Sequence, residues 1–365
     1  METLQAILQK AISLGATDIH LAPNQLPVYR IKRKLFFDET RFSLTPVTLN
    51  KMLEYFYTVI PDLEKSLRER KQADYSYTYS EHRFRINVSL TKSVPTFSIR
   101  VIPNGKINVR DMGLYDIINK MKKVKSGLVL VTGKVNSGKS TTLNAFLQEI
   151  NLTENKKIVT LEDPIEYEHT SDKSIIIQKE IGKESDVMSY HDGLINLLRE
   201  DSDIAVLGEI RDKKTMDVAI DLAESGGLVI GTLHTRSCGE TLERIINMYE
   251  AADQLAVKNS LSSVLKMVVS QKLIVSTSNE LLMVPEVMII NNTLASLIRS
   301  EKFSVSEIED NIHLQSDIGC ISFESSFANL YIRGLVSMDT VKEQVDDDRI
   351  STVKSLIISE GLNVD

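Results

Sequence analysis

The chain has few cysteines, no long apolar run and no excess of positive charge, and each absence excludes a class of protein. Its two cysteines, Cys238 and Cys320, show no CxxC or Cys/His spacing of the kind that a zinc site requires. Such sparse use fits a reducing compartment. Apolar runs such as Leu281–Val284 and Val287–Ile290 are too short to cross a bilayer, and the first residues lack the regions of a signal peptide, so we expect no membrane insertion.

Charge balance bears on the partners. Lysine and arginine number 43 against 50 acidic residues, which gives a formal charge of −7 and a pI near 5.6. A nucleic-acid-binding chain of this charge would need a strongly local basic patch, and the sequence offers none, so we expect no nucleic-acid partner. Hydrophobic residues make up 42% and charged residues 25% of the 365 residues, as in soluble globular proteins. At roughly 150 residues per domain, the length predicts about two domains.

The first part of the chain has the pattern of a small antiparallel α+β domain. Leucines and isoleucines recur at helical spacing up to Leu14, and Gly15 follows as a stop. Alternating strand patterns come next, over residues 28–37, 75–79, 84–90 and 97–101. The alternation lapses from Pro103 through a Pro-Asn-Gly turn signal. We assign residues 1–105 to this domain and residues 106–117 to a linker.

Residues 118–365 follow a different pattern. Short apolar runs rich in β-branched residues lie at residues 127–132, 158–161, 204–207 and 228–232, separated by helical stretches. Continuous apolar runs bounded by turn residues predict strands that are buried on both faces, and therefore a parallel sheet covered by helices. From about Ala251 onward the periodicity predicts helices, with short ones near Phe323–Arg333 and Met338–Val345 at the end.

A phosphate-binding motif joins the first apolar run to a helix. The segment GKVNSGKS, residues 133–140, matches GxxxxGK[ST] between a predicted strand and a helix that begins near Ser140. Its glycines let backbone N–H groups surround phosphates, Lys139 reaches the β and γ phosphates, and Ser140 offers a hydroxyl to Mg²⁺. The alternative is a glycine-containing turn that binds nothing. The residues expected to bind nucleotide are Gly133, Asn136, Ser137, Gly138, Lys139, Ser140 and Thr141.

Two later strands end in polar residues. The run Ile204–Leu207 is followed by Gly208 and Glu209, which places a carboxylate at a strand's carboxyl end, where ligands of open α/β sheets bind. We interpret Glu209 as a Walker B acid in the magnesium shell, although the charges from Glu209 to Asp212 are also compatible with a solvated cluster. The strand after it ends in Thr232 and then His234, which can sense a γ-phosphate or be a satisfied core histidine.

Between these motifs, acidic residues follow another predicted strand. Glu162, Asp163 and Glu166 lie directly after residues 158–161. ATP hydrolysis needs a carboxylate that orients or deprotonates the attacking water. Asp163 precedes a proline and therefore also suits a turn or a helix start. The segment is a candidate for the catalytic carboxylate.

In this order, the four blocks VTGKVNSGKSTTLNAF, VTLEDPIEYEH, LREDSDIAVLGEIRD and LVIGTLHTRS resemble the Walker A, Asp box, Walker B and His box of the secretion-type ATPases that drive type II secretion and type IV pili. The segments ATDIHL (16–21) and HRFRIN (82–87) resemble the family's PAS-like N-terminal domain. The resemblance implies an α/β fold, in which a RecA-like P-loop ATPase domain with a parallel sheet follows a small PAS-like α+β domain.

The resemblance also implies roles for single residues. Lys139 and Ser140 would bind phosphate and Mg²⁺, and Glu166 would be the catalytic carboxylate. Glu209 would be the Walker B acid and His234 the His-box histidine. Arg85 and Arg100 of the first domain would reach the phosphates as arginine fingers; the strand pattern places both on polar faces, where arginines also occur without any special role.

Within the family, the length, the single small N-terminal domain and the absence of a four-cysteine insertion resemble the PilT-type motors of pilus retraction. The segments at residues 319–324 and 331–337 resemble that group as well. The resemblance implies an ATP- and Mg²⁺-dependent ring, a homo-hexamer, that powers pilus retraction and twitching motility. It would lie in the cytoplasm, peripheral to the inner face of the cell membrane, with an inner-membrane pilus platform protein as its partner.

Three departures from the family pattern leave alternatives open. Lys134, Val135 and Asn136 replace the usual Pro, Thr and Gly of the P-loop, and Gly227 stands at the place of the first His-box histidine. Both changes are compatible with slow turnover, and hence with a nucleotide-gated scaffold that hardly hydrolyses ATP. The segment at 294–300, LASLIRS, only partly matches a retraction signature. A motor for pilus assembly or type II secretion is the other alternative.

Overall fold

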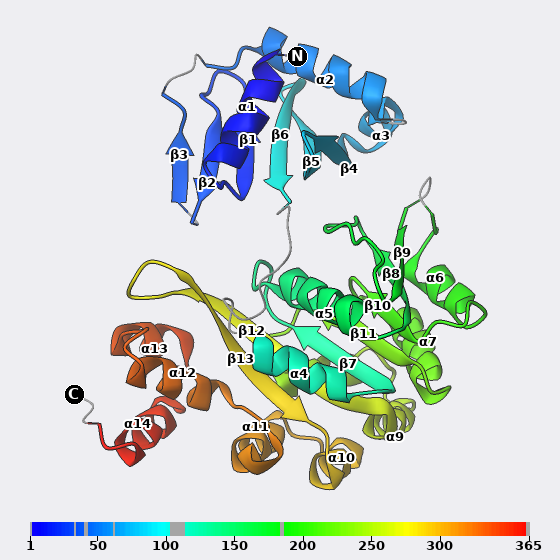
Figure 1. Ribbon diagram of the computed structural model, residues 1–365, viewed down its shortest axis with the longest axis vertical. Coiled ribbons are helices and arrows are strands. Elements are labelled where there is room, and N and C mark those ends of the chain that lie inside the picture. The colour runs from blue at the N-terminus through cyan, green and yellow to red at the C-terminus, as the bar shows by residue number, and fades with distance from the viewer. Residues whose placement is uncertain are drawn as a thin grey trace. The chain divides into compact units, whose positions relative to one another are not determined.

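The computed structural model describes residues 2–32, 34–39, 43–60, 63–102, 114–182 and 186–362. The chain forms two compact units, each with its own hydrophobic core. The first unit comprises Met1–Lys106 and Pro164–Glu168, and the second comprises Ile107–Asp163 and His169–Asp365. Much of the predicted linker at 106–117 lies outside the described residues. Figure 1 labels the elements.

The first unit is a six-stranded antiparallel sheet in the order β3-β2-β1-β6-β5-β4, with helices on one face. This arrangement confirms the antiparallel α+β pattern expected from the sequence. Its elements are α1 (Glu2–Ser13), β1 (Asp18–Leu21), β2 (Val28–Ile31), β3 (Lys34–Phe37), α2 (Pro46–Val59), α3 (Leu63–Arg70), β4 (Gln72–Tyr79), β5 (His82–Thr91) and β6 (Val94–Val101).

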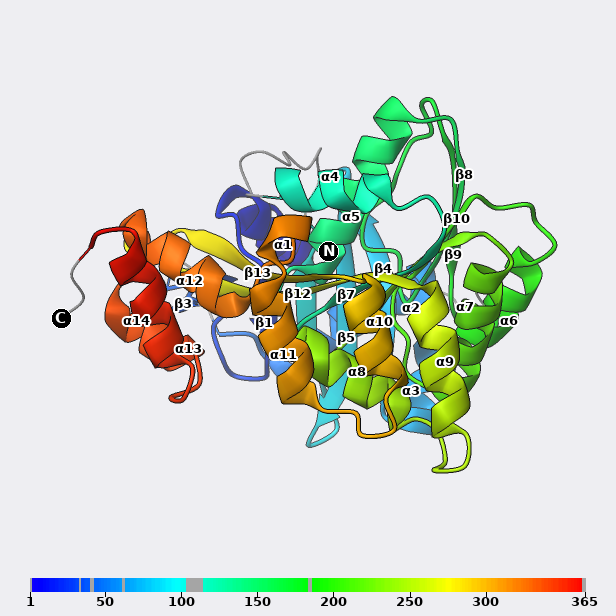
Figure 2. The same ribbon diagram turned by 90° about the horizontal axis from the view of Figure 1, so that it is seen from below.

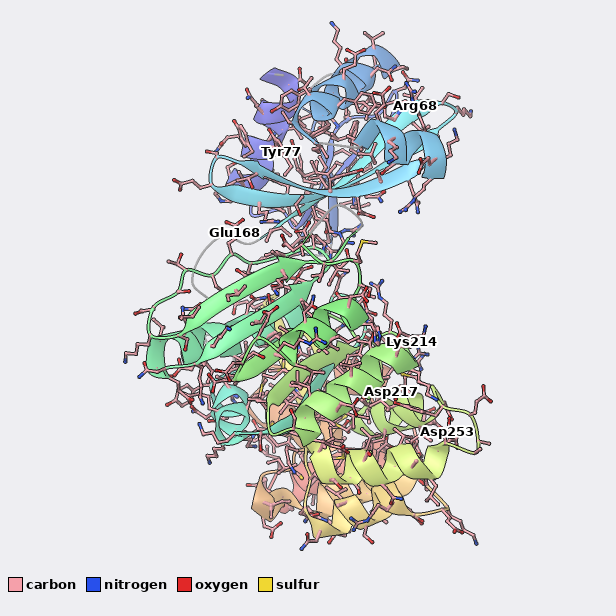
Figure 3. All side chains as sticks on the ribbon, turned by 90° about the vertical axis from the view of Figure 1, so that its right-hand side faces the viewer. Arg68, Tyr77, Glu168, Lys214, Asp217 and Asp253 are labelled. Atoms are coloured by element: carbon pink, nitrogen blue, oxygen red, sulfur yellow. The ribbon has the colours of Figure 1, made fainter. Side chains whose placement is uncertain are left out.

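One face of this sheet forms the core of the first unit. Ile19, Ile99 and Ile86 lie side by side on adjacent strands and are fully buried beneath the helices. Phe56 of α2 packs among them, and its ring meets Tyr77 edge to face at 5.4 Å (Figure 3). Because successive side chains of a strand point to opposite faces, the alternate residues of β1, β5 and β6 are polar and form the other face. That face carries, among others, Asp18, Arg85 and Arg100.

The second unit is built on a seven-stranded sheet in the order β13-β12-β7-β11-β10-β8-β9. β13 is antiparallel to β12, and the other strands are mutually parallel, which confirms the predicted parallel sheet. The elements are α4 (Tyr115–Lys123), β7 (Gly127–Thr132), α5 (Lys139–Thr153), β8 (Lys157–Glu162), β9 (Ile175–Glu180), α6 (Tyr190–Leu197), β10 (Ile204–Leu207), α7 (Lys213–Glu224), β11 (Leu228–Leu233), α8 (Cys238–Ile246), α9 (Gln254–Val264), β12 (Leu265–Val275), β13 (Leu281–Ile289), α10 (Asn292–Arg299), α11 (Val305–Leu314), α12 (Phe323–Ile332), α13 (Met338–Gln344) and α14 (Ile350–Ser359).

Helices cover both faces of this sheet. Along β7, Leu128 and Leu130 join the core beneath α6 to α11, while Val129 and Val131 join the core beneath α4 and α5 (Figures 1 and 2). Each buried aliphatic side chain contributes roughly 1.5–3 kcal/mol to folding. Polar contacts at the rim hold α7 to the segment between α8 and α9: the hydroxyl of Tyr249 donates to Asp217 at 2.7 Å, and Lys213 pairs with Asp253 at 3.0 Å.

Two strands stand where the sequence predicted helix. Residues 265–275 and 281–289 form β12 and β13, so the expectation of helical periodicity from Ala251 onward is wrong for this stretch. The reason is that β12 is buried on both faces between β7 and β13, and a short continuous apolar run has no period that separates strand from helix. Pro285 is tolerated because β13 is an edge strand.

The C-terminal helices pack where β12 ends and β13 begins. Phe323 and Phe327 of α12 join Ile274 and Val284 in a separate small core with α13 and α14. The predicted short helices near Phe323–Arg333 and Met338–Val345 are confirmed as α12 and α13. Among the helices of the described ranges, none is both long and apolar enough to cross a membrane.

Candidate functional site

The loop between β7 and α5 has a backbone that only glycine can supply at two places. At Gly133, with φ of 150°, a Cβ atom would lie 2.3 Å from Oγ of Ser137 and 2.5 Å from the carbonyl oxygen of Gln271. At Gly138, φ is 92°, in the left-handed region, directly before α5 begins. The two glycines therefore let the loop turn tightly around the amino end of α5.

The departures from the usual P-loop are accommodated in this backbone. Asn136 has φ of 63°, and asparagine is among the residues that tolerate the left-handed region best. Lys134 and Val135 are exposed and pack into no core. Replacement of the usual Pro, Thr and Gly is thus compatible with the phosphate-binding conformation.

Three features of the loop between β7 and α5 suit it to bind an anion. The amino end of α5, where Ser140 and Thr141 lie in the first turn, presents a positive helix dipole. Oγ of Ser137 is buried and has no hydrogen-bond partner among the described residues. Lys139 is almost fully buried, and its Nζ donates to the carbonyl oxygens of Gly133 at 2.8 Å and Lys134 at 3.1 Å. A phosphate group would give the Ser137 hydroxyl a partner and can replace the loop carbonyls as acceptor for Lys139.

Three motifs converge on one side chain, His234, which follows β11. Its Nδ1 lies 3.1 Å from Nζ of Lys139, and its Nε2 lies 3.4 Å from Oε1 of Glu209. Burial, and next the Lys139 ammonium, lower the pKa of His234. The lowered pKa leaves the imidazole largely neutral at pH 7, so Nδ1 can accept from the Lys139 ammonium while Nε2 faces the carboxylate of Glu209.

Glu209 is held on its other side as well. Arg211 pairs with its Oε2 at 2.7 Å, and this hydrogen bond raises the pKa of Arg211. The preceding residue, Gly208, donates its N–H to the carbonyl of Leu161 at 2.8 Å, which fixes the end of β10 against β8. The site thus lies at the carboxyl ends of adjacent parallel strands, as expected for an open α/β sheet.

The Asp-box loop is anchored in the second unit at both of its ends. Oε1 of Glu162 accepts from Thr160 at 2.7 Å and from Gln178 at 3.0 Å. His169 lies 2.6 Å from Oδ1 of Asn144, on the helix that follows the P-loop. Between these ends, Pro164–Glu168, which includes Glu166, groups with the first unit, whereas Lys139, Glu209 and His234 belong to the second.

The predicted arginine fingers lie together on the polar face of the first unit. Arg85 and Arg100 are directly opposite on β5 and β6. Like charges at such positions repel, and carboxylates offset this: Nε of Arg85 lies 3.6 Å from Asp74, and Nε of Arg100 lies 3.4 Å from Asp18. Both arginines line a hollow of about 300 Å³ together with Asp74, Asn87 and Ser98.

Sequence reasoning missed Gln271, a residue of β12 that supports the P-loop. Its side chain is buried, donates from Nε2 to the carbonyl of Ser137 at 2.8 Å and accepts from Thr142 at 2.9 Å. Because β12 was expected to be helical, nothing placed this glutamine beside β7. The signal available in the sequence was a polar stretch, Ser270 to Lys272, between the apolar residues 267–269 and 273–275.

Tyr190 was missed as well. Its hydroxyl would lie 3.0 Å from a Cβ at Gly208, so the phenol packs against the Walker B turn. Burial, followed by the charge of Asp163, raises the pKa of Tyr190, which keeps it a neutral O–H donor. Gly227, by contrast, precedes β11 and lies at the amino edge of the sheet. A strand of six residues, about 20 Å long, separates it from the P-loop edge.

The profile of the family described as type II/IV secretion system protein matches residues 1–302. The chain belongs to this family. Type IV pilus retraction ATPase PilT of Pseudomonas aeruginosa is 32% identical over 332 residues, which cover 90% of this chain and 94% of PilT. A twitching motility protein of Neisseria gonorrhoeae is 31% identical, with 85% of this chain and 83% of that protein covered.

Solved structures agree. The crystal structure of the pilus retraction motor PilT with bound ADP superposes with a TM-score of 0.84 at 32% identity, covering 95% of this chain and 98% of that one. The resemblance to secretion-type ATPases, and among them to the retraction motors, is confirmed, as is the expected fold class. The helices α11 to α14 lie beyond residue 302, outside the part that the family profile matches.

Proposed function

We propose that this secretion-family protein is a Mg²⁺-dependent ATPase that acts as a ring-shaped motor of type IV pilus retraction. One observation carries the proposal: Lys139, His234 and Glu209 form a continuous polar chain at the carboxyl ends of adjacent parallel strands. The similarity to retraction ATPases over nine-tenths of the chain supports the pilus assignment. The PilT structure that holds ADP supports nucleotide as the ligand.

The residues divide the work of binding and hydrolysis. The P-loop from Gly133 to Gly138 would cradle the phosphates, with Asn136 at its tip and Lys139 and Thr141 at the start of α5. Ser140 and Glu209 would hold Mg²⁺, which neutralises charge on the phosphates when it is bound. His234, which lies between Lys139 and Glu209, would hold a proton on Nε2 toward Glu209 and present Nδ1 to the Lys139 ammonium.

Three further residues complete the proposed chemistry. Glu166 would orient the attacking water, because among the described residues no side chain or backbone donor engages its carboxylate, whereas Glu162 is already bound by two partners. Arg85 and Arg100 would stabilise the charge that develops on the γ-phosphate. Their ion pairs in the first unit are partly exposed, so exchanging one anion for another costs little.

The assembly is part of the same proposal. A homo-hexameric ring in the cytoplasm, at the inner face of the cell membrane and bound to an inner-membrane platform protein, would convert the chemistry into movement. A P-loop on one unit and arginines on another suit this role, because hydrolysis can then drive rigid-body rotation between units.

Two measurements test the proposal. The purified chain should hydrolyse ATP with Mg²⁺, and deletion of its gene should leave cells with accumulated surface pili that no longer retract. Absence of pili after the deletion would instead identify an assembly motor. Binding of ATP without turnover would identify a nucleotide-gated scaffold, a possibility that the accommodated P-loop and the remote Gly227 do not favour.

A further inference from the structure

The loop after β11, here called the His-box loop and comprising residues 234–237, is fixed by side chains from several elements. The hydroxyls of Thr235 and Thr241 lie 2.7 Å apart, and Ser270 donates to the carbonyl of Arg236 at 3.1 Å. The hydroxyl of Ser237 donates to Oε1 of Glu309 at 2.8 Å. Glu309 belongs to α11, so this contact reaches from the His-box loop to the C-terminal helices.

Ser237 has two functions at this point. It is the N-cap of α8, because its Oγ accepts from the N–H of Glu240 at 3.1 Å. It also donates its own proton to Glu309, and the residue itself is buried. A hydroxyl that is used in both directions has a fixed orientation, so displacement of the Glu309 carboxylate displaces the start of α8 and the loop that carries His234.

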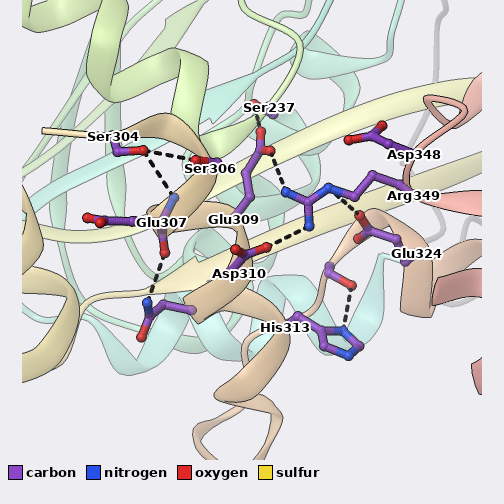
Figure 4. Close-up of polar contacts among 12 residues, drawn as sticks. Ser237, Ser304, Ser306, Glu307, Glu309, Asp310, His313, Glu324, Asp348 and Arg349 are labelled. Carbon is purple, nitrogen blue, oxygen red and sulfur yellow. Dashed lines mark hydrogen bonds and ion pairs between the residues drawn. The ribbon is translucent and has the colours of Figure 1, made fainter. Parts of the chain in front are cut away.

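Arg349, the N-cap of α14, determines where that carboxylate lies. Its guanidinium reaches Glu309 at 3.4 Å, Asp310 at 2.8 Å and Glu324 at 3.8 Å through three different nitrogens (Figure 4). Burial raises the pKa of Glu309, while the Ser237 hydrogen bond and Arg349 lower it. One cation therefore fastens α11, α12 and α14 together. The planar fork of arginine suits this task and a lysine ammonium does not.

We propose that Arg349 and Glu309 are positioning residues of the nucleotide site, which act through Ser237 on His234. Through this connection the C-terminal helices regulate turnover: a partner or neighbouring subunit that shifts α14 changes the position of the histidine between Lys139 and Glu209. The inference rests on the proposed ATPase function for its effect on turnover. The effect on the loop itself does not depend on that function.

Hydrogen exchange of the full-length chain tests the connection without nucleotide. Each of the variants Ser237→Ala, Glu309→Ala and Arg349→Lys should speed hydrogen exchange of the amides at 234–241 by about tenfold. The reason is that each variant removes a contact that keeps this segment from opening locally. Ser337→Ala is the matched control, since Ser337 caps α13 with a hydrogen bond of 3.2 Å and does not contact the loop.

Turnover supplies the second readout. The three variants should lower kcat by roughly tenfold with KM for ATP nearly unchanged, because the P-loop is intact and only the histidine moves. Ser237→Thr keeps a hydroxyl that can both accept from Glu240 and donate to Glu309. Its kcat and its amide exchange at 234–241 should therefore equal those of the wild type, which separates a positioning role from loss of folding. Exchange at 234–241 that is the same in Ser237→Ala and Ser337→Ala would overturn the proposal. Faster exchange in a chain whose wild type hydrolyses no ATP would uphold the connection and reject the ATPase function.

Discussion

The carboxyl edge of the parallel sheet and the polar face of the antiparallel sheet hold their charged residues in different ways. At the first, Lys139 is almost fully buried, and its ammonium is bound by two loop carbonyls and His234. At the second, the side chain of Arg100 is 40% exposed and pairs with Asp18 across water-accessible space. The first region is preorganised for a phosphate. In the second, the arginines are in partly exposed ion pairs, which contribute little free energy and can be exchanged for contacts with another anion.

This difference predicts a division between binding and rate. Lys139 and the amino end of α5 belong to a single unit and fix an anion without help, so substitutions there should affect binding as well as turnover. Arg85 and Arg100 lie in the other unit, so substitutions there should spare binding and slow the chemical step. Four experiments, taken in order of decreasing expected effect on turnover, can break or sharpen this comparison.

Lys139→Ala should eliminate ATP hydrolysis and weaken nucleotide binding, because the site loses its buried ammonium. Steady-state turnover and titration with a fluorescent ATP analogue measure the two effects. Lys134→Ala is the matched control, since that lysine lies in the same loop and is exposed. Wild-type turnover in Lys139→Ala would show that residues 133–140 do not form the phosphate site.

The double variant Arg85→Ala, Arg100→Ala should lower kcat by about 10³, the size of an arginine-finger effect, and leave nucleotide binding unchanged. Arg68→Ala removes an exposed arginine of the same unit, which pairs with Glu64 along its own helix, and should leave kcat unchanged. Sedimentation velocity verifies that the assembly state is preserved. An assembled double variant with full turnover would make the polar face of the first unit a docking surface rather than part of the active site.

Glu166→Gln should lower kcat by roughly a hundredfold with ATP binding retained, since a positioned carboxylate contributes about that much. Glu162→Gln provides the comparison, because Glu162 is bound by Thr160 and Gln178 and should act mainly on the stability of the loop. Single-turnover kinetics distinguish chemistry from product release. An inactive Glu162→Gln beside an active Glu166→Gln would transfer the catalytic role within the Asp box.

Much of the fold and of the site could be predicted from sequence because local patterns determined it. The P-loop motif lies between a strand and a helix in the structure as in the sequence, since Gly133 and Gly138 supply the positive φ angles that the turn between them requires. Alternation in β5 and β6 placed Arg85 and Arg100 on the polar face, and pairing then made them neighbours. Strand pairing itself was beyond the sequence pattern.

What sequence reasoning missed depends on contacts between distant segments. β12 and β13 lack a period that identifies them as strands, and their burial follows from their place beside β7. Gln271 therefore could not be recognised as a support of the P-loop. The connection from Arg349 to Ser237 joins residues more than a hundred positions apart, and its charges lie in ordinary helical patterns. Only the three-dimensional structure brings them together.

Glu286 should have the smallest effect on turnover and a measurable effect on stability. It is fully buried on β13 and accepts from the N–H of Cys238 at 2.6 Å, and burial raises its pKa to about 7 from 4.5. Glu309 and Glu324 contribute to this rise in pKa, the hydrogen bonds with Cys238 oppose it, and the partly buried Lys272 lies nearby. This carboxyl therefore contrasts with the accessible ones that pair with Arg85 and Arg100.

The raised pKa determines the direction of the pH dependence. Between pH 4.5 and about 7 the folded chain holds a proton that the unfolded chain releases, so the contribution of Glu286 to stability falls as pH rises through this range and is constant above it. Glu286→Gln keeps an acceptor for Cys238 and cannot ionise. The variant should gain up to about 3 kcal/mol over wild type between pH 5 and pH 8, with turnover nearly unchanged. Denaturant unfolding of both proteins at several pH values measures the gap, and a gap that stays constant with pH would show that Glu286 ionises as freely as an exposed carboxylate.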